Sequence, residues 1–245
     1  LRAVRLEQRL GFQIERGSAE LMELALPLLA RVSGDRIRHE IEHIFAEAAP
    51  ETMLARLDEL SVPGALHSAW NGHADTWLAE RFVEARERAL WDELPAIYFG
   101  LWVYRLEWPD TEVICRLLKV TSVTMRVLKE NLRVKTGLES LEESDKPSKV
   151  VRVLDGSSDV TMHVVSLAEN ENVRESIQCY RDEYRHVKPT IGGAELIARG
   201  VSPGPRFGRV LGRLRDAWLD GEIVDTTGEG NMLRALLAAQ DEQAL

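Results

Sequence analysis

Residues 31–45 read RVSGDRIRHEIEHIF, and this stretch indicates how the chain folds. Ile37, Ile41 and Ile44 recur at intervals of three and four residues, which is the spacing of one face of an α-helix. Ser33 precedes them, at the position where serine commonly caps a helix N-terminus. The stretch therefore predicts an amphipathic helix whose isoleucines face a protein core.

The same periodicity recurs along most of the chain. Apolar residues at helical spacing occur within 21–29, 54–60, 75–90, 94–106, 112–119 and 122–138. Gly, Pro and Ser clusters separate these runs at short intervals, as in a helical array. The sequence has no βαβ pattern and none of the glycine motifs that cradle nucleotide phosphates. We therefore expect an all-α protein.

One segment is ambiguous. Residues 149–165 read KVVRVLDGSSDVTMHVV, and their β-branched residues around Asp155-Gly156 are compatible with a hairpin. The alternative is a helix that begins at Pro147 and stops at Gly156. We favour the helix, because an isolated hairpin among helices has no sheet to join.

Composition excludes several classes of protein. The 245 residues are 44% hydrophobic and 29% charged, an ordinary balance for a soluble protein. The longest uncharged apolar run, 94–104, is too short to cross a bilayer. Cys115 and Cys179 provide no disulfide framework, which suits a reducing cytoplasm. The net charge of −9 argues against a uniformly basic nucleic-acid binder.

The charge is nevertheless uneven. Residues 196–215 contain five arginines and no acid, whereas acids dominate from Asp216 to the end. A local basic stripe in an acidic protein is a candidate footprint for a polyanion.

The five letters HEIEH at 39–43 match the zinc-protease pattern H-E-x-x-H. His39 and His43 share a helix face, but a zinc site needs a third protein ligand. The best candidate, Glu59, lies in an ordinary amphipathic pattern, and Arg36 and Arg38 place cations beside the site. We expect a polar helix face here rather than a metal centre.

Three longer stretches carry a family resemblance. They are LRAVRLEQRLGFQIE at 1–15, VSGDRIRHEI at 32–41 and ELIARGVSPGPRFGRVLGRLRDAWLDGEI at 195–223. Together they resemble the C-terminal part of class II tRNA nucleotidyltransferases, the CCA-adding or A-adding enzymes, and the related bacterial poly(A) polymerases. The resemblance implies an elongated, all-α arrangement of neck (1–60), body (61–145) and tail (146–245).

The resemblance also implies what the chain lacks. The catalytic head of the family precedes the neck, and this sequence contains no D-x-D pair to hold the metal ions of nucleotidyl transfer. We expect a truncated chain, inactive alone and without cofactors. The intact enzyme would use Mg²⁺ with ATP or CTP to extend RNA 3′ ends. Its partners would be tRNA or another RNA and the head of the same polypeptide, without a membrane.

Two family motifs map to the neck. The last part of the nucleotide-templating motif E-D-x-x-R-x-x-R falls on the first residues, which implies nucleotide binding by Arg2 and Arg5. A bracing motif, E-R-x-x-x-E, matches Asp35, Arg36 and Glu40, with Asp in place of the first Glu. Both carboxylates are expected to hold arginines of the first helix by charge-assisted bonds. For Glu40, ordinary pairing along its own helix is the alternative.

The sequence of the tail from Gly204 to Arg213 predicts an RNA-binding surface. Pro205 suits the first position of a helix after Gly204, and the amides of the next three residues would then point at a phosphate. These residues are Arg206, Phe207 and Gly208. Arg206, Arg209 and Arg213 share one face of the predicted helix.

Two further basic stripes have the same helical spacing. They are Arg126, Lys129 and Arg133, and Lys146, Lys149 and Arg152. Contacts from such stripes would be directed to RNA backbone and shape, because A-form RNA hides its base edges in a deep groove. The alternatives are solvated helix faces, and a helical protein-interaction scaffold that binds no RNA.

Overall fold

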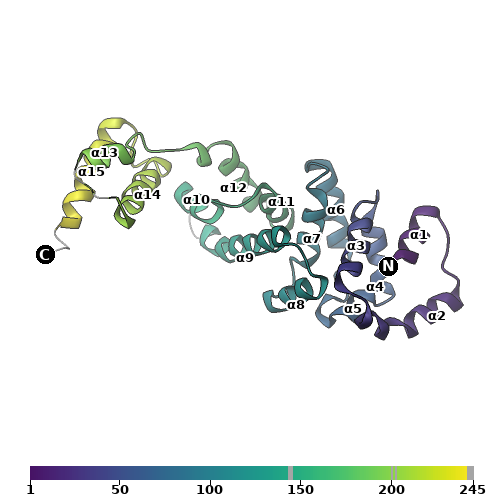
Figure 1. The fold of residues 1–245 in the computed structure, drawn as a ribbon. Coiled ribbons are helices and arrows are strands. Elements are labelled where there is room, and N and C mark those ends of the chain that lie inside the picture. Colours follow the sequence, from purple (N-terminus) through teal and green to yellow (C-terminus); the bar gives the residue numbers. More distant parts are fainter. Residues whose placement is uncertain (143–145, 200, 202, 242–245) are drawn as a thin grey trace. The chain divides into compact units, whose positions relative to one another are not determined.

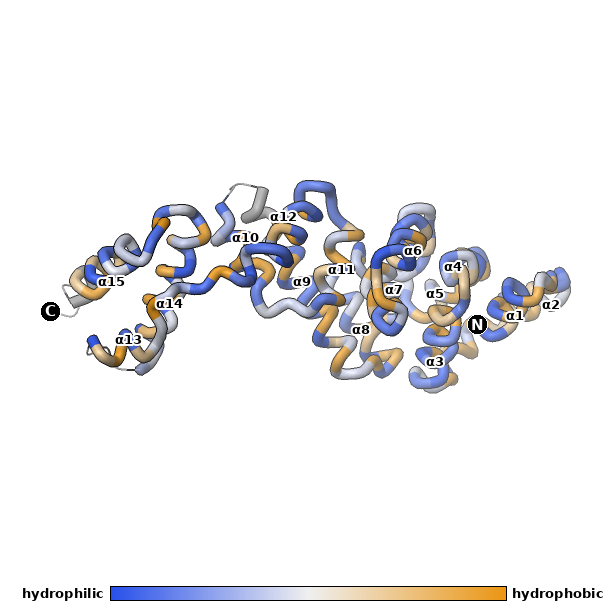
Figure 2. The backbone as a smooth tube through the Cα atoms, turned by 90° about the horizontal axis from the view of Figure 1, so that it is seen from above, coloured by the Kyte–Doolittle hydropathy of each residue, from blue (hydrophilic) through white to orange (hydrophobic). Residues whose placement is uncertain are grey.

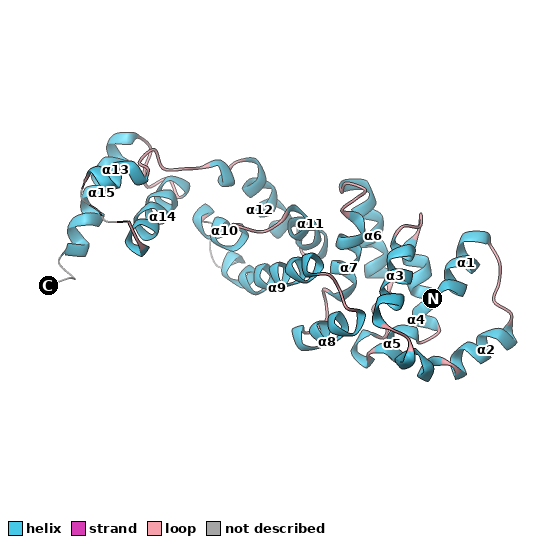
Figure 3. Ribbon diagram, viewed as in Figure 1, coloured by secondary structure: helices cyan, strands magenta, loops and turns pink. Residues whose placement is uncertain are grey.

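Ile37, Ile41 and Ile44 are each no more than 2% exposed, and they lie on helix α3 (Gly34–Phe45) as their spacing predicts. The computed structural model describes residues 1–142, 146–199, 201 and 203–241. Within these ranges every regular element is a helix, which confirms the all-α prediction (Figures 1 and 3). Along most helices hydrophobic and hydrophilic stretches alternate (Figure 2).

The chain forms two compact units, the first comprising Leu1–Lys135 and Ser157–Glu171 and the second Thr136–Gly156 and Asn172–Leu245. Helix α9 (Ser122–Glu142) contributes residues to both. The other helices of the first unit are α1 (Arg2–Leu10), α2 (Arg16–Leu24), η1 (Leu26–Arg31), α3, α4 (Pro50–Glu59), α5 (Val62–Leu66), η2 (Ser68–Trp70), α6 (Thr76–Arg88), α7 (Leu94–Val103), α8 (Trp108–Leu118) and α11 (Asp159–Ala168). Those of the second are α10 (Pro147–Leu154), α12 (Glu171–Asp182), η3 (Tyr184–His186), α13 (Gly193–Ala198), α14 (Pro205–Leu219) and α15 (Thr226–Asp241).

An aromatic cluster forms the core of the first unit. Phe82 stacks on Tyr98 with ring centroids 4.2 Å apart, and Trp70 lies 4.3 Å from Trp102. Phe45 of α3 meets the rings of Phe82, Tyr98 and Trp102. Helix α7, which supplies Tyr98 and Trp102, is buried along most of its length, so α3 is anchored on a rigid centre.

Helix α3 also passes very close to α8. An ideal Cβ at Gly34 would lie only 1.8 Å from the carbonyl oxygen of Leu117. Only glycine fits this approach, because the obstructing atoms belong to backbone. Ser33 occupies the N-cap position as predicted, although its side chain makes no capping hydrogen bond.

The run 21–29 is not one continuous helix. Helix α2 ends at Leu24, and a 3-10 helix with Pro27 near its start follows. Proline has no amide hydrogen to continue an α-helical ladder, which explains the break. Leu21, Leu24 and Leu28 are exposed, so their helical spacing does not mark a buried face here.

The ambiguous segment 149–165 is helical. It forms α10, with Pro147 at its start, and α11, and the turn between them contains Gly156 at φ +77°. The hairpin alternative is therefore wrong. Glycine reaches this left-handed backbone conformation without strain, which allows the chain to reverse between the two helices.

The second unit has its own hydrophobic core. Leu196 of α13, Leu214 of α14 and Leu233 of α15 are fully buried together. Glu229 is also fully buried, and it accepts hydrogen bonds from the Thr190 hydroxyl and the Ile191 amide. This carboxylate fixes the segment before α13 to the first turn of α15.

Candidate RNA-binding surfaces

Helix α3 carries both carboxylates of the predicted bracing motif, and one of them, Glu40, contacts helix α1. Arg5 of α1 forms an ion pair with Glu40 of α3 at 3.8 Å, and it donates to Glu47 at 3.3 Å. The Arg5 side chain is only 15% exposed, so water weakens its attraction to the two carboxylates only a little. Arg2, the other predicted nucleotide contact, is exposed.

Asp35 has different partners from those expected. Its carboxylate accepts from the Lys119 ammonium at 3.1 Å and pairs with Arg38 at 3.5 Å. The Lys119 hydrogen bond holds the pKa of Asp35 below its usual value. Asp35 therefore ties the start of α3 to the end of α8, and Arg36 beside it is exposed.

Glu7 of α1 makes a connection in the first unit that was not predicted from the sequence. It is 8% exposed, and it accepts from the Ile14 amide at 2.8 Å and from the Arg56 guanidinium at 3.1 Å. These bonds fix α1 to α4 and to the loop before α2. No periodicity marks Glu7, because its partners lie 7 and 49 residues away.

The two histidines of HEIEH lie on the exposed side of α3. In the part of the chain that the structure describes, no three His, Cys, Asp or Glu side chains gather as metal ligands would. No described helix is long and apolar enough to cross a membrane.

Helix α14 turns Val210, Leu214 and Ala217 to the core of the second unit. Gly204 is its N-cap and Pro205 lies at its start, as the sequence predicts. Gly208 and Arg209 are exposed, while Arg206 is half-buried.

Phe207 differs from its predicted role in two respects. Its amide donates to the Gly204 carbonyl at 2.9 Å, so this N–H is already used within the turn. Its ring packs against the core of the second unit, where an ideal Cβ at Gly193 would lie 3.2 Å away. Phe207 thus anchors the start of α14.

Two of the predicted basic stripes lie on neighbouring helices. Helix α10 packs on α14, and Ser148 donates from its amide (2.9 Å) and its hydroxyl (2.8 Å) to Asp220. Arg152 of α10 pairs with Asp216 of α14, while Lys149 is half-buried. The stripes 146–152 and 206–213 therefore belong to one surface of the second unit.

Acids at the end of α14 partly neutralise this surface. Arg213 pairs with Glu222, and Lys146 lies 3.7 Å from Asp220. Arg209, by contrast, is exposed and has no ion pair among the described residues. Of the three arginines in the stripe 206–213, Arg209 is therefore the most available to an external phosphate.

A basic segment follows α12, and none of its residues was predicted as a site residue from the sequence. Arg185, His186 and Lys188 are exposed on η3 and just beyond it. Arg215 of α14 donates to the Val187 carbonyl at 3.0 Å and to Asp155 at 2.9 Å, which fixes this segment beside α10 and α14. The run YRHVKP at 184–189 was the available signal.

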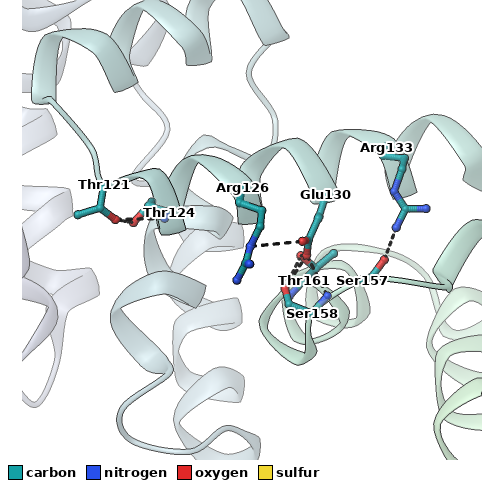
Figure 4. A network of polar contacts seen from close by, with 8 residues as sticks. All are labelled: Thr121, Thr124, Arg126, Glu130, Arg133, Ser157, Ser158 and Thr161. Carbon is teal, nitrogen blue, oxygen red and sulfur yellow. Dashed lines mark hydrogen bonds and ion pairs between the residues drawn. The ribbon is translucent and has the colours of Figure 1, made fainter.

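The third stripe borders a groove of about 440 Å³ on the first unit, lined by Ser122, Met125, Arg126, Lys129, Glu130 and Arg133. Its three basic side chains are exposed. Arg126 lies 3.8 Å from Glu130, and Arg133 donates to the Ser157 hydroxyl at 2.6 Å (Figure 4). The groove begins at the N-terminal end of α9, where the helix dipole favours anions.

Comparisons with known proteins identify a family model and several relatives that this chain resembles. A family model described as "Probable RNA and SrmB- binding site of polymerase A" matches residues 11–63. The chain is 28% identical over 253 residues to the A-adding tRNA nucleotidyltransferase of Geobacter sulfurreducens, covering 93% of this chain and 28% of that protein.

Two solved structures share the fold. A Thermotoga maritima CCA-adding enzyme complexed with tRNA superposes with a TM-score of 0.71 at 21% identity, over 98% of this chain and 60% of that one. A CCA-adding enzyme in complex with ATP gives 0.73 at 22% identity, over 98% and 59%. The chain thus spans about 60% of the length of these two proteins and 28% of the Geobacter relative.

Two findings bear on the class of protein: residues 11–63 match a model of a probable RNA-binding site, and the described residues share the all-helical fold of a part of the CCA-adding enzymes. In sequence and fold the chain is similar to a part of the class II CCA- and A-adding tRNA nucleotidyltransferases.

Proposed function

We propose that this chain binds the acceptor and elbow region of tRNA through its basic surfaces and presents the RNA 3′ end to a nucleotide-adding catalytic head. The observation that carries the proposal is the α14 face with its exposed Arg209, in a protein whose net charge is −9. Basic residues concentrated on selected faces of an acidic protein indicate specific binding of a polyanion rather than non-specific electrostatic association.

Each basic surface then contacts phosphates. On the second unit the contacts come from Arg206, Arg209 and Arg213 of α14 and from Lys149 and Arg152 of α10. On the first unit they come from Arg126 and Lys129 of α9. Gly204 and Gly208 leave the start of α14 uncovered, since an ideal Cβ at either would meet nothing within 4 Å. Such contacts fix the position of an RNA without reading its sequence.

The neck serves the nucleotide side of the reaction in this proposal. Glu40 and Glu47 hold the Arg5 guanidinium in place, which limits the conformations from which it meets a nucleotide. Arg2 is exposed one turn earlier on the same helix and is the more accessible of the two. The intact enzyme then adds AMP, or CMP and AMP, with Mg²⁺ held by its head.

A charge reversal tests RNA binding. Arg209→Glu is expected to weaken binding of a tRNA transcript by at least about tenfold at low salt, because it removes an attraction and adds a repulsion. Fluorescence anisotropy over a salt series measures it, and the slope of log K against log salt should become shallower by about 1 or more.

Arg116→Glu is the matched control. Arg116 is a highly exposed arginine on α8, outside residues 11–63 and outside the three basic surfaces, and it pairs with Glu112 one turn away. The control should bind tRNA almost as the parent chain does. Equal effects of the two reversals, or absence of salt-sensitive binding by a folded sample, would refute the proposal.

One observation favours a second function, a protein-docking scaffold. Leu24 is 77% exposed, and Leu21 and Leu28 are also exposed on the α2–η1 segment. Exposed leucines at helical spacing suit an interaction with another helix. Under this alternative, Leu24→Ser abolishes capture of a protein partner while tRNA binding stays unchanged or absent.

A further inference from the structure

Glu130 stands out because it lies inside a cationic groove. A carboxylate among Arg126, Lys129 and Arg133 should repel the phosphates that those residues attract. Its other contacts are numerous. Figure 4 shows the carboxylate at the centre of a polar network that joins α9 to the start of α11.

The network saturates one oxygen of Glu130. The Ser158 amide (2.9 Å), the Ser158 hydroxyl (2.7 Å) and the Thr161 hydroxyl (2.9 Å) all donate to Oε2. Its Oε1 faces Arg126 at 3.8 Å. Although partial burial opposes ionisation, these hydrogen bonds and Arg126 hold the pKa of Glu130 below its usual value, so the group is charged at neutral pH.

The turn before α11 also fixes the far end of the groove. Ser157 accepts from Arg133 at 2.6 Å, directly beside the residue that bonds to Glu130. Arg126 and Arg133 are therefore oriented by neighbouring positions of one turn. They stand seven residues apart on α9, about 10 Å along the helix axis.

We infer that Glu130 and Ser157 are positioning residues that hold Arg126 and Arg133 as a preordered clamp for two phosphates of one RNA strand. Successive phosphates of a duplex strand are roughly 3 Å apart along its axis, so the about 10 Å between the two arginines spans about three nucleotide steps. Preordering removes entropy that long side chains would otherwise lose on binding. The inference rests on the proposed function and deepens it.

The direction in which one substitution changes RNA affinity separates this positioning role from simple repulsion. Glu130→Gln removes a negative charge from the groove, so electrostatics alone predicts tighter RNA binding. A positioning role predicts binding about three- to tenfold weaker, which corresponds to typical coupling between residues in contact. Gln keeps an amide oxygen that can accept from Ser158, which favours a folded variant.

The decisive measurement is a double-mutant cycle with Arg126→Gln, read by anisotropy with a tRNA transcript and the chain 1–245. In the Arg126→Gln background there is no Arg126 side chain for Glu130 to position. Glu130→Gln should therefore lose most of its effect on affinity there, or tighten binding. Ser157→Ala changes no charge and should weaken binding about threefold, with an unchanged salt slope. Should Glu130→Gln fail to fold, Arg126→Gln at an exposed residue and Ser157→Ala at a half-buried one carry the test.

Glu112→Gln is the matched control, since Glu112 pairs with Arg116 at i, i+4 on α8 and does not line the groove. It should leave affinity unchanged or slightly raise it. Tighter binding by Glu130→Gln, or no effect of Ser157→Ala, overturns the clamp. If Arg209→Glu still weakens binding in that case, the proposed function stands; if no variant matters, both fail.

Discussion

A single methyl group at Gly34 is expected to disrupt the crossing of α3 and α8. An alanine Cβ would lie 1.8 Å from the Leu117 carbonyl oxygen, 2.9 Å from its carbonyl carbon and 3.2 Å from the Leu118 Cα. One helix must move by more than about 1 Å to restore contact near 3 Å. The obstructing atoms are backbone, so no side-chain rotation relieves the overlap.

Overpacking of this kind costs about 1–3 kcal/mol, and the rigid backbone contact places Gly34→Ala at the upper end, near 3 kcal/mol. The small helix-propensity gain of alanine, at most about 1 kcal/mol, offsets part of it. The expected net loss is therefore about 2 kcal/mol. For a unit of this size, that lowers the melting temperature by roughly 4–8 °C.

Gly17→Ala is the control, because Gly17 is also near a helix start and an ideal Cβ there meets nothing within 4 Å. It should leave stability unchanged or raise it by up to about 1 kcal/mol. Thermal and urea unfolding followed by circular dichroism compare the two variants. If they agree within about 0.5 kcal/mol, the argument from close helix packing is wrong.

Three other outcomes are expected. Glu229→Ala should destabilise the second unit by about 1–3 kcal/mol in urea unfolding, because it leaves the half-buried Ile191 amide without its acceptor; Glu229→Gln should cost less, and equal costs would contradict the hydrogen-bond account. Gly212→Ala should stabilise α14 by up to about 1 kcal/mol, since its Cβ meets open space, yet weaken tRNA binding if RNA approaches that face; unchanged affinity would exclude a close approach. Because the folded pKa of Glu130 lies below its unfolded value, its stabilisation is present at neutral pH and is lost as pH falls through the folded pKa; Glu130→Gln should flatten the acid limb of the stability curve, and an unchanged limb would contradict this.

Much of the fold follows from short-range sequence patterns. The spacing of Ile37, Ile41 and Ile44 predicted both the helix and its buried face, because residues three and four apart share one side of a helix. The same argument failed for Leu21, Leu24 and Leu28, which are exposed beside a break at Pro27. Periodicity detects an apolar face, but it does not show what covers that face.

The candidate surfaces were also partly readable from sequence. Basic residues at helical spacing are bound to share a face once the helix forms, as Arg126, Lys129 and Arg133 do on α9. The acidic partners of these basic residues could not be predicted from the sequence. Arg213 is neutralised by Glu222, whereas Arg209 in the same stripe is exposed.

The sequence by itself determined that this chain is helical, approximately where several of its helices lie, and which helix faces carry positive charge, since all of these depend on neighbours within a turn or two. The tertiary structure alone decided the partners of the charged side chains. Asp35 pairs with Lys119, 84 residues away, and Glu130 bonds to Ser158, 28 residues away. Such pairs depend on which helices pack together, and the packing is fixed by buried shape and volume over the whole core rather than by any local pattern.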